Sequence, residues 1–270
     1  MLLGKKLGVA IPDTVLEERD TLRDKTVKVG TIARALAIYG VDSVAVFRDE
    51  KGRGEGPLIR KLLGYLETPQ YLRKRIYQLD EELKFAGLLP PLRIPSHRPR
   101  TPLEGVKVGE VREGVVNQDG TVDVGLERPA RLRGNAASGA RVTVELVSKE
   151  PFTAKPVPRD GLREYWGYIV KGGSFREAVS DSAFDLKVAT SRLGSDLRTV
   201  IEPLGRSFKS ARGAVLLFGS PSRGLFDIVG PNLTKQTDYV VNLFADQQVE
   251  TVRTEEAIFA ALNLAQTLII

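Results

Sequence analysis

Apolar residues fall along most of this chain in short uninterrupted runs, the pattern of parallel strands buried on both faces of a sheet. These runs predict strands at residues 7–11, 43–47, 165–170, 186–190, 214–218 and 239–244. Stretches with helical spacing lie between them, at residues 30–40, 69–85, 175–184, 195–201 and 254–268. This order predicts an α/β fold with a parallel sheet.

Residues 104–150 follow a different pattern, in which apolar and polar positions alternate. Val122 and Val124 flank Asp123, as in a half-buried strand, and Asp119-Gly120 is a good hairpin turn. The expected strands are residues 111–117, 121–126, 131–134 and 141–147. Such a segment is typical of a small OB-like β-barrel, a class that often binds oligonucleotides.

Two proline-rich stretches, residues 90–102 and 151–158, bracket this segment. Proline cannot continue a helix or a central strand, so both stretches are expected to be semi-rigid spacers. The sequence therefore predicts a discontinuous α/β domain, residues 1–95 and 158–270, with a barrel of residues 104–150 inserted into it.

Composition excludes several kinds of chemistry. The 270 residues include no cysteine, which excludes disulfides, zinc fingers and thiol nucleophiles. They include one histidine, which argues against Ser-His-Asp triads and multi-histidine metal sites, so no metal is expected. There is no signal-like N-terminus and no apolar run of about eighteen residues, so we expect a cytoplasmic protein without a membrane partner. The lone histidine, His97, is expected in a linker facing solvent or RNA, and Trp166 in the core or in a dimer contact.

The formal net charge of +6 favours an anionic partner, of which nucleic acid is the commonest, although many ordinary enzymes are equally basic. Four arginines lie in the predicted barrel and are candidate RNA contacts. They are Arg128, Arg131, Arg133 and Arg141. Solvated arginines on an ordinary β-module would give the same pattern.

Ligands of parallel sheets bind at the carboxyl ends of strands, and two predicted ends carry candidate chemistry. The first is the loop Gly219–Gly224, whose glycines let the backbone approach a ligand. Leu225-Phe226 follow it where a phosphate loop needs Lys and Ser or Thr, which argues against an NTPase. The second end, residues 242–257, is a polar loop that leads into a helix N-terminus. A tight turn and a capped helix would explain both segments without any ligand.

Arg34 is a third candidate. It lies near the start of the helix predicted at residues 30–40, where a cation opposes the helix dipole. This placement indicates a side chain kept for an anion, with an ordinary surface arginine as the alternative.

Taken together, several segments resemble one family over essentially the whole chain. They are residues 32–35, 65–74, 83–92, 112–116, 165–168, 190–196, 217–219 and 252–257, among which Glu67–Lys74 and Val252–Ala257 are the most specific. On these residues the chain is identified as a member of the archaeal and eukaryotic RNA methyltransferase family of the SPOUT (SpoU–TrmD) superfamily.

The resemblance implies a Rossmann-like sheet whose C-terminal part is threaded into a trefoil (α/β) knot, an OB-like insert, and a homodimer. It implies that S-adenosyl-L-methionine binds in the knot and leaves as S-adenosyl-L-homocysteine. The contacts that it implies are Thr190, Leu217, Phe218, Gly219, Asn242, Leu243, Val252, Arg253, Thr254 and Glu255. It also places Arg34, as the catalytic residue, near the acceptor. The short loop Gly219–Gly224 leaves Ser220 and Arg223 open as contacts.

The expected activity is S-adenosylmethionine-dependent methylation of RNA, in particular of rRNA at a base nitrogen, with uridine N3 favoured. Methyl transfer from a sulfonium is an in-line displacement that depends on positioning and requires no covalent intermediate. Two alternatives remain open from the sequence: a ribose 2′-O-methyltransferase, and a non-catalytic RNA-binding protein that uses the OB-like barrel.

Overall fold

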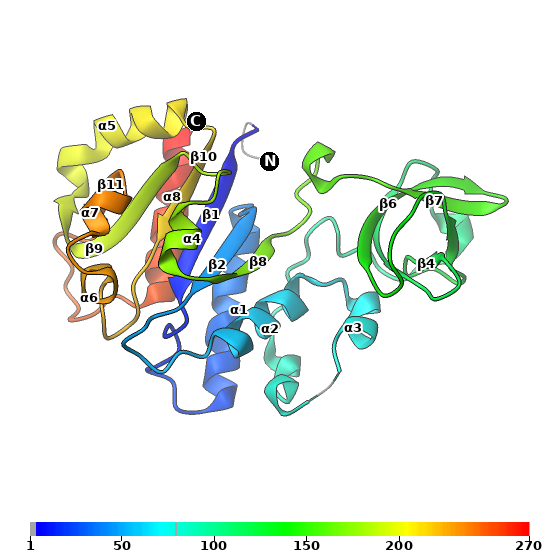
Figure 1. Cartoon of the computed structure of the whole chain (residues 1–270), viewed down its shortest axis with the longest axis horizontal. Coiled ribbons are helices and arrows are strands. Elements are labelled where there is room, and N and C mark those ends of the chain that lie inside the picture. Colours follow the sequence, from blue (N-terminus) through cyan, green and yellow to red (C-terminus); the bar gives the residue numbers. More distant parts are fainter. Residues whose placement is uncertain (1–3, 79, 270) are drawn as a thin grey trace. The chain divides into compact units, whose positions relative to one another are not determined.

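A computed structural model describes residues 4–78 and 80–269 (Figure 1). The chain forms two compact units, each assembled from separate stretches of sequence. Unit 1 comprises residues 1–66, 82–91 and 167–270, and unit 2 comprises residues 67–81 and 92–166. Unit 2 therefore takes in residues on both sides of the segment 104–150.

Unit 1 is built on a six-stranded sheet in the order β11-β9-β10-β1-β2-β8, and every neighbouring pair is parallel. The strands are β1 (Lys6–Pro12), β2 (Ser43–Phe47), β8 (Ile169–Gly173), β9 (Leu186–Asp196), β10 (Gly213–Leu217) and β11 (Tyr239–Asn242). The predicted parallel α/β sheet is thus confirmed. The strand expected at residues 165–170 begins at Ile169, four residues later than predicted. The apolar residues Trp166 and Tyr168, which suggested an earlier start, are buried ahead of the strand.

Helices cover both faces of this sheet (Figure 1). One face carries α4 (Phe175–Val179), α6 (Leu225–Val229) and α7 (Leu233–Gln236), whose Phe175, Leu225 and Leu233 pack into a shared apolar core with residues of the strands. The other carries α1 (Leu22–Ile38), α5 (Leu197–Ser210) and α8 (Thr254–Ile269), and α8 contacts both α1 and α5. No helix within residues 4–78 and 80–269 combines the length and apolarity needed to cross a bilayer.

The first helix starts earlier than its apolar pattern suggested. Thr21 caps α1 by accepting a hydrogen bond from the Asp24 backbone N–H at 3.1 Å, and the helix then runs to Ile38. Arg34 consequently lies close to the C-terminal end of α1, where a cation is favourable to the helix dipole. The prediction that Arg34 opposes the dipole at a helix start is wrong, because the charged first turns of α1 hid its true beginning.

Unit 2 contains a closed five-stranded barrel in the order β3-β4-β5-β7-β6. Its strands are β3 (Val111–Val116), β4 (Thr121–Asp123), β5 (Ala130–Leu132), β6 (Arg141–Lys149) and β7 (Phe152–Pro156). The pair β5–β7 is parallel, and the other neighbours are antiparallel. Alternate residues such as Val122, Val144 and Ala154 fill the barrel and are fully buried.

Two predictions about unit 2 are wrong. Residues 151–158 are not a spacer, because β7 completes the barrel there: Pro151 precedes the strand, Pro156 is its last residue and Pro158 follows it. The helix expected at residues 69–85 is only α3 (Gln70–Ile76), since Tyr77 adopts an extended backbone. The helix α2 (Gly56–Glu67) precedes it and was missed. Short 3₁₀ turns complete the chain: η1 (Glu81–Leu83), η2 (Ala86–Leu88), η3 (Leu103–Gly105) and η4 (Arg159–Gly161).

Candidate active site

A cavity of about 560 Å³ opens in unit 1 beyond the carboxyl ends of β9, β10 and β11. Because these strands are parallel neighbours, the loops that follow them meet at one edge of the sheet. Three segments line the cavity: residues 190–193, residues 218–227, and residues from Asn242 to Ala257. The fold therefore brings two loops that are far apart in the sequence, and an irregular stretch inside β9, around one cavity.

The loop after β10 folds back tightly on itself. A Cβ at Gly219 would lie 2.8 Å from the carbonyl oxygen of Arg223 and 3.0 Å from Cα of Gly224, so only glycine fits there. The Ser220 N–H donates to the Arg223 carbonyl at 2.9 Å, and α6 begins immediately after the turn. This backbone forms one wall of the cavity.

Arg223 is fixed to acidic side chains of unit 1. Its guanidinium lies 2.7 Å from Oδ2 and 3.3 Å from Oδ1 of the fully buried Asp49, and 3.6 Å from Glu17. Burial works against the charge on Glu17, but hydrogen bonds from Ser220 and Ser222, together with the charge of Arg223, hold the pKa of Glu17 below its usual value. Arg223 thus stabilises the loop, and its charge is neutralised locally.

The other walls are tied to this loop by side chains of the predicted site. The Thr254 hydroxyl, at the start of α8, donates to the Gly219 carbonyl at 3.3 Å. The Thr190 hydroxyl donates to the Leu217 carbonyl at 3.1 Å. Asn242 Nδ2 donates to the Arg192 carbonyl at 3.2 Å. The three segments are therefore joined directly around the cavity.

Most of the predicted cofactor residues line this cavity. They are Thr190, Phe218, Gly219, Asn242, Leu243, Val252 and Thr254. Leu217 is fully buried in the strand behind it. Arg253 and Glu255 point to a second cavity of about 480 Å³, where Glu255 lies 3.1 Å from the ammonium of the buried Lys28.

Some lining residues were missed. Leu193 is 77% exposed, and it comes from the stretch where the pairing of β9 with β11 shifts between Val240 and Val241. Phe226, Phe244 and Gln247 also line the cavity. An irregular strand has no periodic signature, so its residues 191–193 could not be assigned to the site in advance.

Arg34 is not among the residues that line either cavity of unit 1 in the part of the chain that the structure describes. Its side chain is half-buried, and Nη1 donates to the Pro91 carbonyl at 3.3 Å. A catalytic role for Arg34 remains a prediction.

The four arginines predicted to contact RNA separate into two groups. Arg128, Arg131 and Arg133 are exposed on the barrel. Arg141 instead bonds to two buried carboxylates, Glu67 at 2.6 Å and Glu113 at 2.6 Å. Its guanidinium is committed to the interior of unit 2, and we remove it from the candidate RNA surface.

Arg141 belongs to an ionic network in which Arg159 also lies 2.7 Å from Glu67 and 3.5 Å from Glu113. The Thr143 hydroxyl and the Trp166 indole N–H each donate to Glu113 at 2.5 Å. Burial works against the charge of Glu113, but the two arginines and Thr143 hold the pKa of Glu113 below its usual value. The network joins β3, β6 and the segment after β7.

His97 was expected to face solvent or RNA, and this prediction is wrong. Its ring is largely buried, and Nε2 lies 2.8 Å from the carbonyl oxygen of Glu67, to which it donates. Burial lowers the pKa of His97 to about 4. The residue is therefore a neutral structural donor.

The aromatic residues considered for a dimer contact are internal. Trp166 is 5% exposed in unit 2, and Tyr168 is 1% exposed in unit 1, where its hydroxyl donates to the Leu63 carbonyl at 3.0 Å. The core alternative for Trp166 is confirmed. These aromatic residues give no support to a dimer.

Comparison with known proteins assigns the chain to a family. The model of the family described as "Putative RNA methyltransferase" matches residues 6–265. The chain belongs to this family of RNA methyltransferases, which confirms the SPOUT-type resemblance and makes the protein an enzyme by class.

Relatives cover nearly the whole chain. An uncharacterized protein of Halobacterium salinarum is 35% identical over 95% of this chain and 97% of its own length. The 28S rRNA (uridine-N(3))-methyltransferases of Mus musculus and Homo sapiens are 33% and 32% identical, each over 96% of this chain and over 76% and 77% of their own lengths. This chain is therefore similar to enzymes named for a base nitrogen of rRNA.

Proposed function

We propose that this protein uses S-adenosyl-L-methionine to methylate N3 of a uridine in rRNA. The observation that carries the proposal is the cavity at the ends of β9, β10 and β11, which gathers most of the predicted cofactor residues into one space. The names of the mammalian relatives, 28S rRNA (uridine-N(3))-methyltransferases, support N3 of uridine as the acceptor atom.

The residues of the cavity suit the donor. A volume of about 560 Å³ lies in the range of small-molecule sites. Leu243 and Val252 supply apolar surface for an adenine ring, with Phe218 buried behind the cavity wall, and the backbone around Gly219 supplies close polar edges. When bound, the donor supplies an electrophilic methyl group on a sulfonium. The protein's part is to hold the acceptor in line with that methyl group.

Uridine N3 carries a proton that must pass to solvent water before or during the transfer, so that the N3 lone pair can attack the methyl group. A nearby cation favours the deprotonated base. On the family resemblance we propose Arg34 as that cation. Because Arg34 lies outside the cavity of its own chain, a second copy of the protein is the natural source of the side chain.

A homodimer is therefore part of the proposal. Unit 1 exposes apolar side chains that a second copy would cover, among them Val27, Ile38, Leu193 and Val249. We further propose that residues 190–254 form the trefoil knot that the resemblance implies, with the cavity inside it. Light scattering should give twice the monomer mass, and a monomer at all practical concentrations would contradict the dimer.

We propose that the barrel of unit 2 is OB-like and binds the RNA. Its strand order, with the third and fifth strands parallel, supports this class. Arg128, Arg131 and Arg133 are exposed on it and would contact RNA phosphates.

Titration calorimetry with S-adenosylmethionine and S-adenosylhomocysteine, with EDTA present, tests the cofactor assignment. We expect saturable binding of both at one site per chain. The absence of any heat signal at high micromolar ligand would overturn the assignment.

A further inference from the structure

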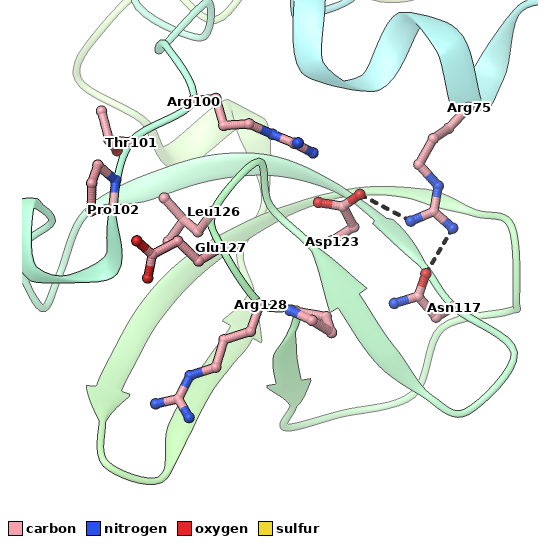
Figure 2. Close-up of a pocket in the computed structure, with 10 residues that line it drawn as sticks. Arg75, Arg100, Thr101, Pro102, Asn117, Asp123, Leu126, Glu127 and Arg128 are labelled. Atoms are coloured by element: carbon pink, nitrogen blue, oxygen red, sulfur yellow. Dashed lines mark hydrogen bonds and ion pairs between the residues drawn. The ribbon is translucent and has the colours of Figure 1, made fainter.

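A hollow of about 460 Å³ lies on unit 2, outside the site already described (Figure 2). It is lined by α3, by the linker before β3, and by the loop between β4 and β5. These segments supply three arginines: Arg75, Arg100 and Arg128. Only Arg128 was among the residues predicted to contact RNA.

Arg75 is held in a fixed position. Its Nη1 lies 2.9 Å from Oδ2 of Asp123, and its Nη2 donates to Oδ1 of Asn117 at 2.7 Å (Figure 2). The other oxygen of Asp123 accepts the Gly125 N–H at 3.0 Å. The charge of Asp123 is therefore already balanced, although 41% of the Arg75 side chain is exposed.

Arg100 has no such partner. Within residues 4–78 and 80–269, no hydrogen bond or ion pair engages its guanidinium, and the residue is exposed. Figure 2 shows its side chain extending from the linker toward the space above Asp123, and the guanidinium of Arg75 lies beside Asp123, to which it is bonded. Arg128 extends the opposite way, and its Nη2 donates to the Lys149 carbonyl at 3.4 Å. Arg75, which is paired with Asp123, and Arg100 therefore lie at one end of the hollow, and the carboxylate of Glu127 also lines it.

The rest of the lining is partly apolar. The exposed Pro102 and Pro129 line the hollow beside Thr101 and Asn117, and Leu126, which is 4% exposed, lies behind them in the barrel core. A phosphate alone would not use this surface, whereas the sugar and base of an unpaired nucleotide would. A base inside a duplex could not enter the hollow.

The outer face of the barrel continues from this hollow. In the ladder between β4 and β5, Thr121 is paired with the exposed Arg131, and Asp123 lies two residues on from Thr121 on the same face. Arg133 follows Arg131 at the same spacing and is also exposed. Cations therefore extend from the hollow along β5, as a strand of phosphates would require.

We propose that this hollow binds one unpaired nucleotide of the RNA substrate, with its phosphodiester on Arg75 and Arg100 and its sugar and base against the exposed Pro102 and Pro129. This inference rests on the proposed function, because it assumes that the substrate is RNA. It adds Arg75 and Arg100, which lie outside the predicted barrel segment, to the substrate-binding residues.

The test is the affinity of the full-length protein for a fluorescent single-stranded oligoribonucleotide and for its duplex, measured by anisotropy at several salt concentrations. Arg100→Glu should weaken single-strand binding by roughly tenfold or more and reduce the salt slope by about one contact. Duplex binding should fall less. Arg163→Glu, the same charge change at an exposed arginine of unit 2 outside the hollow, is the matched control and should have a smaller effect.

Folding is not at issue for Arg100, since its side chain is exposed, and an unchanged melting temperature would verify this. Equal losses for Arg100→Glu and Arg163→Glu, or equal losses for single strand and duplex, would overturn the proposal. If the wild type bound the methyl donor and methylated RNA while Arg100→Glu kept full RNA affinity, the hollow alone would be refuted. If the wild type did neither, the proposed function would fail instead.

Discussion

The cavity of unit 1 and the hollow of unit 2 are built on opposite principles. In the cavity, tight backbone turns bring glycine and strand ends close to a ligand, and Arg223 is paired with the buried Asp49. In the hollow, side chains form the surface, and Arg100 is left with no partner among the described residues. A cavity wall of closely packed backbone suits a compact ligand that is held by shape, whereas a cationic side chain without an ion-pair partner suits a polyanion.

The interiors of the two units also differ, because buried charges contribute to unit 2. The sheet of unit 1 packs on apolar side chains such as Phe47 and Leu225. Unit 2 has a small apolar barrel core, to which a buried ionic network around Glu113 is added. We infer that the barrel depends on buried charge for its attachment to its flanking segments, and that the cofactor cavity does not.

The largest expected effect follows from removing the centre of that network. Glu113→Ala leaves Arg141 and Arg159 without one of their carboxylates and should destabilise unit 2 by roughly 3–5 kcal/mol. Trp166 is the chain's one tryptophan and donates to Glu113, so urea unfolding followed by its fluorescence reports on this unit. The exposed Glu127→Ala is the control and should change little. Loss of cofactor affinity in Glu113→Ala would contradict the independence of the two units.

Removing the Arg34 side chain should have the next largest effect, which should be confined to the rate of methyl transfer. If its charge stabilises the acceptor, Arg34→Ala should lower single-turnover methylation by roughly 10²–10³-fold, and Arg34→Lys should restore part of it. Cofactor affinity should be unchanged, because Arg34 does not line the cavity of its own chain. Near-normal methylation by Arg34→Ala would show that it is an ordinary surface arginine.

A methyl group at the tight turn should damage the cavity itself. Gly219→Ala places Cβ within 3.0 Å of two backbone atoms, so the loop must shift, and S-adenosylhomocysteine affinity should fall roughly 10- to 100-fold. Gly87→Ala, at an exposed position with open space around it in the same unit, is the matched control. Single-strand RNA affinity should be equal in both variants. Unchanged cofactor affinity in Gly219→Ala would mean that this loop is not part of the site.

The smallest effect concerns pH. The pKa of His97 is lowered to about 4 in the folded protein, so the unfolded chain binds a proton more readily between about pH 6.5 and 4. Its contribution to stability is complete above pH 6.5 and is lost as the pH falls toward 4, by about 1 kcal/mol per pH unit. Burial raises the pKa of Glu67, which acts in the opposite sense, so His97→Gln must be compared with the wild type at each pH. The variant should show the weaker loss of Trp166-reported stability on acidification, and parallel pH profiles would refute the assignment.

The parallel sheet could be predicted from sequence because its central strands, such as β10, are buried on both faces and consist of unbroken apolar runs. The two loops around the cavity could be predicted because they follow strands and match the family. The pairing of charged side chains could not be predicted from sequence. Nothing in the spacing of Arg141 distinguishes a buried partner of Glu67 and Glu113 from a solvated arginine. The start of α1 and the strand β7 were missed because a charged first turn and flanking prolines masked them.

The central claim is that the cavity of unit 1 carries out methylation of uridine N3 in rRNA. Its most direct test is nucleoside mass spectrometry and position mapping of rRNA methylated by the purified wild type, with Gly219→Ala beside it. The account predicts 3-methyluridine at a defined rRNA position with the wild type, and a large reduction with Gly219→Ala. A ribose-methylated nucleotide as the product, or no new methyl group in rRNA at all, would contradict it.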